Sequence, residues 1–106
     1  MLKQKIKPMQ QLTQYETIYI LKPEEKEIYL VCLNIISEYE NILKNQGAQN
    51  IFTQNRGRRY LAYPINKYND GIFLQLIFEG NGQIIEILEK DMKFNEKILR
   101  HLITRQ

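Results

Sequence analysis

Apolar and polar residues follow two different periods along this chain, and the order of these segments predicts the fold. Residues 15–21 are β-branched and aromatic, which is typical of a strand. From Ile28 to Leu43 apolar residues recur every three or four positions, and this stripe predicts an amphipathic helix of about four turns. Pro23 and the three glutamates that end at Glu27 predict that the helix begins at the proline, with acids at the positive end of its dipole.

The second half of the chain alternates strand and helix signals in the same way. In chain order we expect a long strand or bent strand pair over residues 48–65, a turn over 68–71, a strand over 72–79, a helix capped by Asn81 and reaching Met92, and a last strand over 98–104. The order is therefore β-α-β-β-α-β. Because two helices can cover one face of four strands, the pattern predicts an α+β, ferredoxin-like fold with a four-stranded antiparallel sheet.

Length and composition indicate a single globular domain. The chain has 106 residues, of which 43% are hydrophobic and 25% charged, as in ordinary globular proteins. Residues 1–14 are polar and show no clear period, so we expect a flexible extension there and one domain over residues 15–106. No apolar run approaches the roughly 20 residues of a membrane span, so we expect no membrane contact.

The helices are expected to leave one face of the sheet uncovered. If Ile72 and the alternate residues after it face the helices, Phe73, Gln75 and Ile77 point away from them. An uncovered face that carries Phe and Ile favours a partner, either RNA or protein. The alternative is that a few scattered apolar side chains on an open sheet have no role.

Positive charge is concentrated in the middle of the chain. The net charge is only +3, but residues 48–70 carry four basic residues against one acidic residue. Arg56, Arg58 and Arg59 suit phosphate or carboxylate oxygens, and Tyr60 offers a flat face on which a base can stack. RNA is therefore the first candidate ligand. The alternative is a solvated basic arm that keeps a sheet edge from aggregating.

No set of residues supports catalysis, a cofactor, a metal or a small-molecule substrate. His101 is the only histidine, and Cys32 lies within the apolar stripe, where a small buried hydrophobe is its expected role. We expect His101 to lie at the surface or to face RNA. The two glycines that flank Asn81 lack the spacing of a phosphate-binding loop. An acylphosphatase-like site would need an arginine and an asparagine at a phosphate cradle, and Asn55 and Arg56 lie in no such loop.

The RNA-recognition motif has the same element order, but its signature is missing. That motif needs a basic residue, a glycine and an aromatic residue before Phe-Val-x-aromatic on its third strand. Here Arg56-Gly57 is followed by two further arginines, and the strand over residues 72–78 lacks the glycine and its basic neighbour.

Four segments together resemble the bacterial-type small-subunit ribosomal protein six, in its plastid and cyanobacterial branch. They are Tyr15-Glu16-Thr17, Arg58-Arg59-Tyr60-Leu61-Ala62-Tyr63-Pro64-Ile65, Asp70-Gly71-Ile72-Phe73 and Ile98-Leu99-Arg100-His101-Leu102. The resemblance covers residues 15–105 and implies a ferredoxin-like fold without catalytic activity. It also implies binding to the central domain of small-subunit ribosomal RNA, together with the eighteenth small-subunit ribosomal protein.

These arguments assign two sets of contact residues. We expect RNA contact from Arg56, Arg58, Arg59, Tyr60 and Lys67. We expect partner contact from Phe73, Gln75, Ile77 and Arg100. The alternative function is a stand-alone protein-interaction or regulatory module that uses its open sheet face.

Residue usage adds an expectation about location. Sixteen isoleucines against two alanines, with abundant Lys, Asn and Tyr, suggest an AT-rich genome such as that of an organelle. The first residues lack the features of a transit or secretory signal, so we expect neither import nor export. A plastid ribosome is the expected location, with the bacterial cytoplasm as the alternative.

Overall fold

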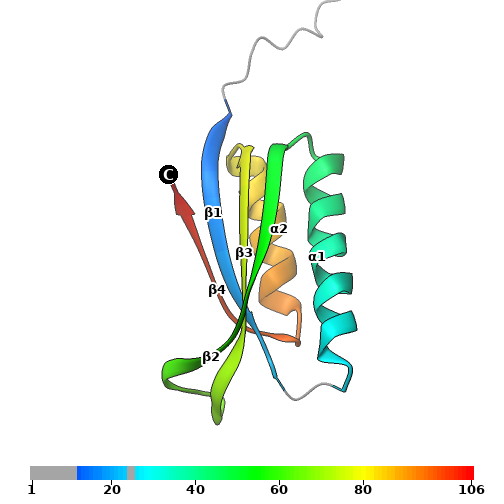
Figure 1. Cartoon of the computed structure of the whole chain (residues 1–106). Helices are drawn as coiled ribbons and strands as arrows, with labels where there is room; N and C mark the ends of the chain where they lie inside the picture. Colours follow the sequence, from blue (N-terminus) through cyan, green and yellow to red (C-terminus); the bar gives the residue numbers. More distant parts are fainter. Residues whose placement is uncertain (1–11, 24–25) are drawn as a thin grey trace, which may run out of the picture.

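A computed structural model of the chain describes residues 12–23 and 26–106 and shows two helices against one face of an antiparallel sheet (Figure 1). The elements are β1 (Thr13–Leu21), α1 (Ile28–Asn45), β2 (Gln49–Ile65), β3 (Tyr68–Gly80), α2 (Gly82–Phe94) and β4 (Ile98–Arg105). The strands lie in the order β2-β3-β1-β4, and every neighbouring pair is antiparallel. The predicted α+β, ferredoxin-like fold is confirmed.

The domain begins before residue 15, where the sequence placed its start. Thr13 and Gln14 already belong to β1, where they pair with Gly80 and Glu79 of β3. The backbone N–H of Gln106 also donates to the Gln14 carbonyl oxygen. The expected flexible extension is therefore wrong for these two residues, because strand pairing holds them. Leu12 lies just before the strand, and the rest of that expectation, for residues 1–11, lies outside the described residues.

Helix α1 begins later than Pro23. Glu27 occupies the N-cap position with φ 53°, in the left-handed region, and the first turn contains no acidic residue. A residue in that conformation cannot continue a right-handed helix toward the N-terminus. The predicted start and the predicted acidic first turn are therefore wrong for Pro23 and Glu27, whereas Glu24 and Glu25 lie outside the described residues. The predicted stripe is confirmed, with Cys32, Ile35, Tyr39 and Leu43 buried.

The turn between β2 and β3 lies at Asn66 and Lys67, and not over residues 68–71. Both residues have positive φ, 50° and 71°, as in the two-residue turns whose twist matches that of the flanking strands. Tyr68 consequently pairs with Ile65, and residues 68–71 extend β3. The hairpin is therefore longer than the sequence pattern predicted.

The core lies between the sheet and the two helices. Alternate residues of β3, from Ile72 to Phe78, are buried together with Tyr19 of β1 and Leu88 of α2. Tyr19 and Tyr39 meet edge to face with ring centroids 5.5 Å apart, and burial raises the pKa of both phenols. Neither helix of the described chain is both long and apolar enough to cross a membrane.

Helix α2 begins where the sequence placed it. The Asn81 side-chain oxygen accepts a hydrogen bond from the Ile84 backbone N–H at 3.0 Å, which satisfies one of the free donors of the first turn. The helix then buries Ile84, Leu88 and Met92 on one side. The face of the sheet opposite both helices is the open face (Figure 1). The strand register places all the residues predicted to contact a partner on this face.

Candidate nucleic-acid interface

The far end of the β2–β3 hairpin extends beyond the rest of the sheet. The pairing of β1 with β3 ends at Leu21 and Ile72, so residues 59–71 form a ribbon of two strands, which we call the arm. Figure 1 shows the arm at the lower end of the sheet, turned away from the helices. The three clustered arginines lie at its base and on its first strand.

A bulge at the base of the arm separates the directions of the arginines. The register shifts between Asn55 and Gly57, which leaves Arg56 as the extra residue of β2. Gly57 has φ 86°, which a residue with a side chain rarely adopts, and its N–H donates to the Asn55 side-chain oxygen at 2.8 Å. The bulge turns Arg56 onto the open face, where its Nε and Nη2 donate to Gln75 Oε1 at 3.0 and 2.8 Å.

The other two arginines have different surroundings. Arg58 Nε lies 2.6 Å from Asp70 Oδ2, and this ion pair partly offsets the arginine's charge at the surface. Arg59 Nε instead donates to the backbone carbonyl oxygen of Arg56 at 3.2 Å. The ion pairs found among the described residues include neither Arg56 nor Arg59. These two guanidinium groups thus keep an uncompensated charge that a phosphate can neutralise.

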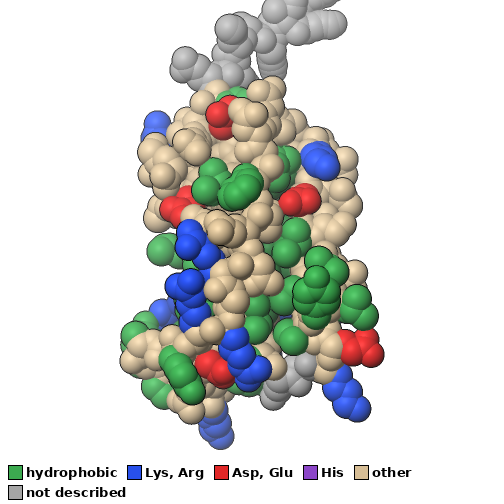
Figure 2. Space-filling view, in the orientation of Figure 1, with side chains coloured by type: hydrophobic (Ala, Val, Ile, Leu, Met, Phe, Trp, Pro, Cys, Tyr) green, Lys and Arg blue, Asp and Glu red, His purple; other side chains and the backbone are tan. Residues whose placement is uncertain are grey.

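Tyr60 and Lys67 complete the predicted RNA-contacting set. Tyr60 is 86% exposed, and Lys67 is exposed at the tip of the turn. A crease of about 260 Å³ lies beside Tyr60 and is lined by Arg58, Arg59 and Asp70. Figure 2 shows Lys and Arg side chains gathered over the lower part of the molecule, around the hairpin, with an acidic side chain among them. The five residues thus lie together on the arm or at its base.

The open face carries a chain of polar contacts that reaches across all four strands. Gln75, which is 7% exposed, accepts from Arg56 and donates through Nε2 to the carboxylate of Glu16 on β1. The Gln106 side chain, just after β4, donates to the other oxygen of Glu16 at 3.2 Å. Both ends of the Gln75 amide are therefore used inside the molecule, so Gln75 holds Arg56 and Glu16 in place on this face.

Apolar side chains flank this polar chain. Phe52 of β2 and Leu102 of β4 are 54% and 60% exposed, while Phe73 and Ile77 of β3 are half-buried between them. Phe52 and Leu102 were not singled out from the sequence. Side chains at alternate positions of a strand share a face of the sheet. Once the strand order was known, this rule could have placed Phe52 on β2 and Leu102 on β4 on the open face.

Arg100, predicted to contact a partner, is engaged with the arm. Its Nη1 donates to the Tyr63 hydroxyl at 2.7 Å, and the guanidinium carbon lies 5.6 Å from the centroid of the Tyr63 ring. The two residues are 37 positions apart in sequence. Nothing in their local patterns indicates the contact.

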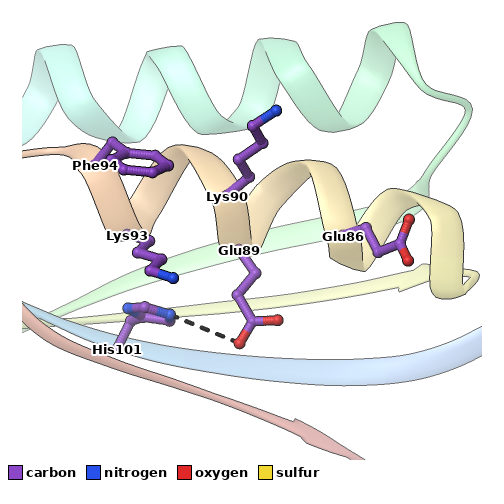
Figure 3. Close-up of a pocket in the computed structure, with 6 residues that line it drawn as sticks. All are labelled: Glu86, Glu89, Lys90, Lys93, Phe94 and His101. Atoms are coloured by element: carbon purple, nitrogen blue, oxygen red, sulfur yellow. Dashed lines mark ion pairs between the residues drawn. The ribbon is translucent and has the colours of Figure 1, made fainter.

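His101 lies on the helix side of β4 with its side chain 20% exposed, so it lines the surface as one half of the expectation had it, away from the proposed RNA-contacting arginines of the arm. Figure 3 shows His101 below α2, in a groove of about 550 Å³ that Lys93 and Phe94 also line. Its Nε2 is 3.9 Å from Glu89 Oε2, a pair that becomes ionic when the imidazole is protonated. Within the described residues, no three histidine, cysteine or acidic side chains lie close enough to hold a metal ion.

Comparison with known proteins gives a consistent result. The family model of ribosomal protein S6 matches residues 14–105. Small ribosomal subunit protein bS6c of Guillardia theta is 50% identical over 96 residues, which are 91% of this chain and 98% of that protein. The bS6c protein of Pyropia yezoensis is 48% identical over 91% of this chain and 86% of its own length. The bS6 protein of the Trichormus variabilis strain is 42% identical, with 89% and 85% covered.

A solved structure supports the fold independently. The crystal structure of 30S ribosomal protein S6 from Thermotoga maritima superposes with a TM-score of 0.81, covering 91% of this chain and 89% of that one. Its sequence is 24% identical, so this likeness bears on the fold alone.

Proposed function

The chain belongs to the ribosomal protein S6 family, and from this premise we propose that it binds the central domain of small-subunit ribosomal RNA, together with the eighteenth small-subunit ribosomal protein. The family consists of structural proteins of the small ribosomal subunit, so the chain is not an enzyme. Its relatives named bS6c are of the plastid type, and the chain is accordingly assigned to the plastid ribosome.

The arm is the structural feature that supports the proposed RNA binding. It extends past the end of β1, and most of its β2 residues are exposed to a large ligand. The ion pairs found in the described part of the chain include neither Arg56 nor Arg59, and Tyr60 is 86% exposed. Guanidinium groups bind phosphate oxygens and an exposed ring stacks on an unpaired base. No base-reading motif accompanies the arginines, so phosphates are their expected ligands.

The open face is the surface proposed for the protein partner. It presents Phe52 and Leu102, with Phe73 and Ile77 half-buried between them, on the side of the sheet that no helix covers. Exposed apolar side chains that share one face are typical of protein–protein contacts. Glu16, held by Gln75 and Gln106, offers a carboxylate to a basic partner.

The test is a triple substitution, R56Q/R58Q/R59Q, assayed for binding to central-domain ribosomal RNA in the presence of the partner protein. Each lost phosphate contact should reduce the magnitude of the log-affinity against log-salt slope by about 0.7–0.9. Among the single variants, R58Q should have the smallest effect, because Asp70 already offsets that charge. Thermal stability should change little, since all three side chains are exposed.

The matched control removes three charges from the helix side, as K90Q/K93Q/K97Q. These lysines are exposed on α2 or just after it, on segments other than the arm. An equal loss of affinity in the control would show that net charge alone is responsible. Unchanged affinity and slope in the arginine variant would remove the arm from the RNA contact. Self-association of the chain without RNA or partner would favour the alternative, a stand-alone interaction module.

A further inference from the structure

We propose that Arg100 is a positioning residue for RNA binding, which fixes the direction of the arm by holding Tyr63 against the beginning of β4. This inference rests on the proposed RNA-binding role of the arm. It differs from the sequence-based expectation, in which Arg100 contacts the protein partner. The contact joins the two outer strands of the sheet, which share no backbone ladder.

The sheet alone leaves the direction of the arm weakly determined. From Gly71 to the turn, β3 pairs with β2 and no longer with β1, because the pairing with β1 ends at Ile72. A two-stranded ribbon has marginal stability by itself and twists strongly. A contact from outside the ribbon is therefore needed to hold the arm in one direction relative to the sheet.

The Tyr63–Arg100 contact has the geometry to supply this restraint. A hydrogen bond of 2.7 Å fixes the hydroxyl, and the guanidinium lies 5.6 Å from the ring centroid, within the range of a cation–π interaction. Tyr63 precedes Pro64, which restricts the Tyr63 backbone to extended conformations. The register of β2 with β3 shifts between Tyr60 and Ile65, so the ladder does not pair Tyr63, and Arg100 contacts its ring at the hydroxyl and at the face.

A second feature draws the base of the arm toward the sheet. A Cβ built on Gly71 would lie 2.4 Å from Ile20 Cγ2 and 3.0 Å from the Leu21 carbonyl oxygen. The absence of a side chain at Gly71 thus lets the ribbon pass close over the end of β1. The close approach at its base and the Tyr63–Arg100 contact farther along together define the direction of the arm.

The direction of the arm matters because Arg59 and Tyr60 lie on it. If the arm samples several directions, only the fraction in the binding direction can engage RNA, and the apparent dissociation constant rises as that fraction falls. Arg100 would therefore affect RNA affinity without contacting a phosphate. A direct contact and a positioning role predict different results for paired variants.

The first experiment measures binding to central-domain ribosomal RNA, with the partner protein present, for Y63L, R100Q and the double variant. R105Q serves as the control, because it removes one exposed positive charge from the same strand. We expect Y63L and R100Q each to weaken binding by roughly three- to tenfold, more than R105Q, and the double variant to be no weaker than the worse single one. The salt slope of R100Q should match that of R105Q.

Two results would overturn the proposal by showing that Arg100 contacts a phosphate. One is a loss of affinity in the double variant equal to the sum of the two single losses, and the other is a log-affinity against log-salt slope reduced in magnitude by about 0.7–0.9 in R100Q but not in R105Q. Unchanged affinity in Y63L would overturn it as well. The Y63F variant keeps the ring and loses the hydroxyl, so it should lie between the wild type and Y63L.

The second experiment uses the free protein and separates this proposal from the proposed function. Residual dipolar couplings of amides in residues 59–71, compared with those of β1 and β3, report the direction of the arm. They should change in Y63L and R100Q and stay unchanged in R105Q. Unchanged couplings in all three variants would reject the restraint. Changed couplings together with a wild-type chain that fails to bind RNA would confirm the restraint and refute the proposed function.

Discussion

Replacing Gly71 by alanine tests how closely the arm passes over the sheet. Gly71 lies on β3, next to the last residue that pairs with β1. Its added Cβ would meet Ile20 Cγ2 at 2.4 Å, a distance that real Cβ atoms essentially never show, and the Leu21 carbonyl oxygen at 3.0 Å. The methyl group belongs to a β-branched side chain with a stiff χ1 angle, and the oxygen belongs to a strand held in the sheet.

The clash therefore has to be relieved by a shift of backbone or by an unfavourable rotamer of Ile20. Overpacking of this kind in a tightly packed region typically costs about 1–3 kcal/mol of the free energy of unfolding. For a domain of this size, each kcal/mol lowers the melting temperature by roughly 4–8 °C. We therefore expect Gly71→Ala to melt at least about 4 °C below the wild type.

Thermal unfolding followed by circular dichroism is the assay, with Gly82→Ala as the matched control. A Cβ at Gly82 meets nothing within 4 Å, and Gly82 is the first residue of α2. An alanine there should be neutral or stabilising by about 0.4–1 kcal/mol. Alanine allows the unfolded chain fewer conformations than glycine does, so folding costs less conformational entropy. A melting temperature for Gly71→Ala within about 1 °C of the wild type, or an equal fall in Gly82→Ala, would refute the reasoning.

Two further predictions concern the core. Ile35→Ala should lower the free energy of unfolding by about 2–5 kcal/mol in urea titration, because Ile35 is 4% exposed within the α1 stripe; a loss below about 0.5 kcal/mol would contradict its place in the core. Burial raises the pKa of the Cys32 thiol in the folded state above that in the unfolded state. The thiol therefore makes its whole contribution to stability at pH values below the pKa of the unfolded state, and this contribution falls as the pH rises. A thiol reagent at mildly alkaline pH should therefore label native Cys32 more slowly than the urea-unfolded chain, and equal rates would show that the thiol is open to solvent.

The sequence by itself determined the elements and the sides they bury. The stripe of α1 and the alternation of β3 were readable because a helix and a strand repeat with fixed periods, so apolar positions identify the face that packs. The cap at Asn81 was readable because it depends on a hydrogen bond to a residue three positions away. The arginines and Tyr60 were readable as one cluster because they are neighbours in the chain, and the arm keeps them together.

The tertiary structure decided features in which local signals compete or are missing. Two adjacent segments, Asn66-Lys67 and residues 68–71, compete for the turn, and strand pairing selects the first. The start of α1 likewise depends on Glu27 adopting a left-handed conformation, which its local sequence does not indicate.

Contacts between distant strands were beyond any local pattern. The bond between Tyr63 and Arg100 joins β2 to β4, and the contact of Gln75 with Glu16 spans 59 positions. Such pairs form because strand order and twist bring the side chains to the same place, and neither quantity is encoded in the spacing of nearby residues. The sequence thus determined the cluster of positive charge before the hairpin turn, whereas the packing of four strands decided where the turn lies and where the arm points.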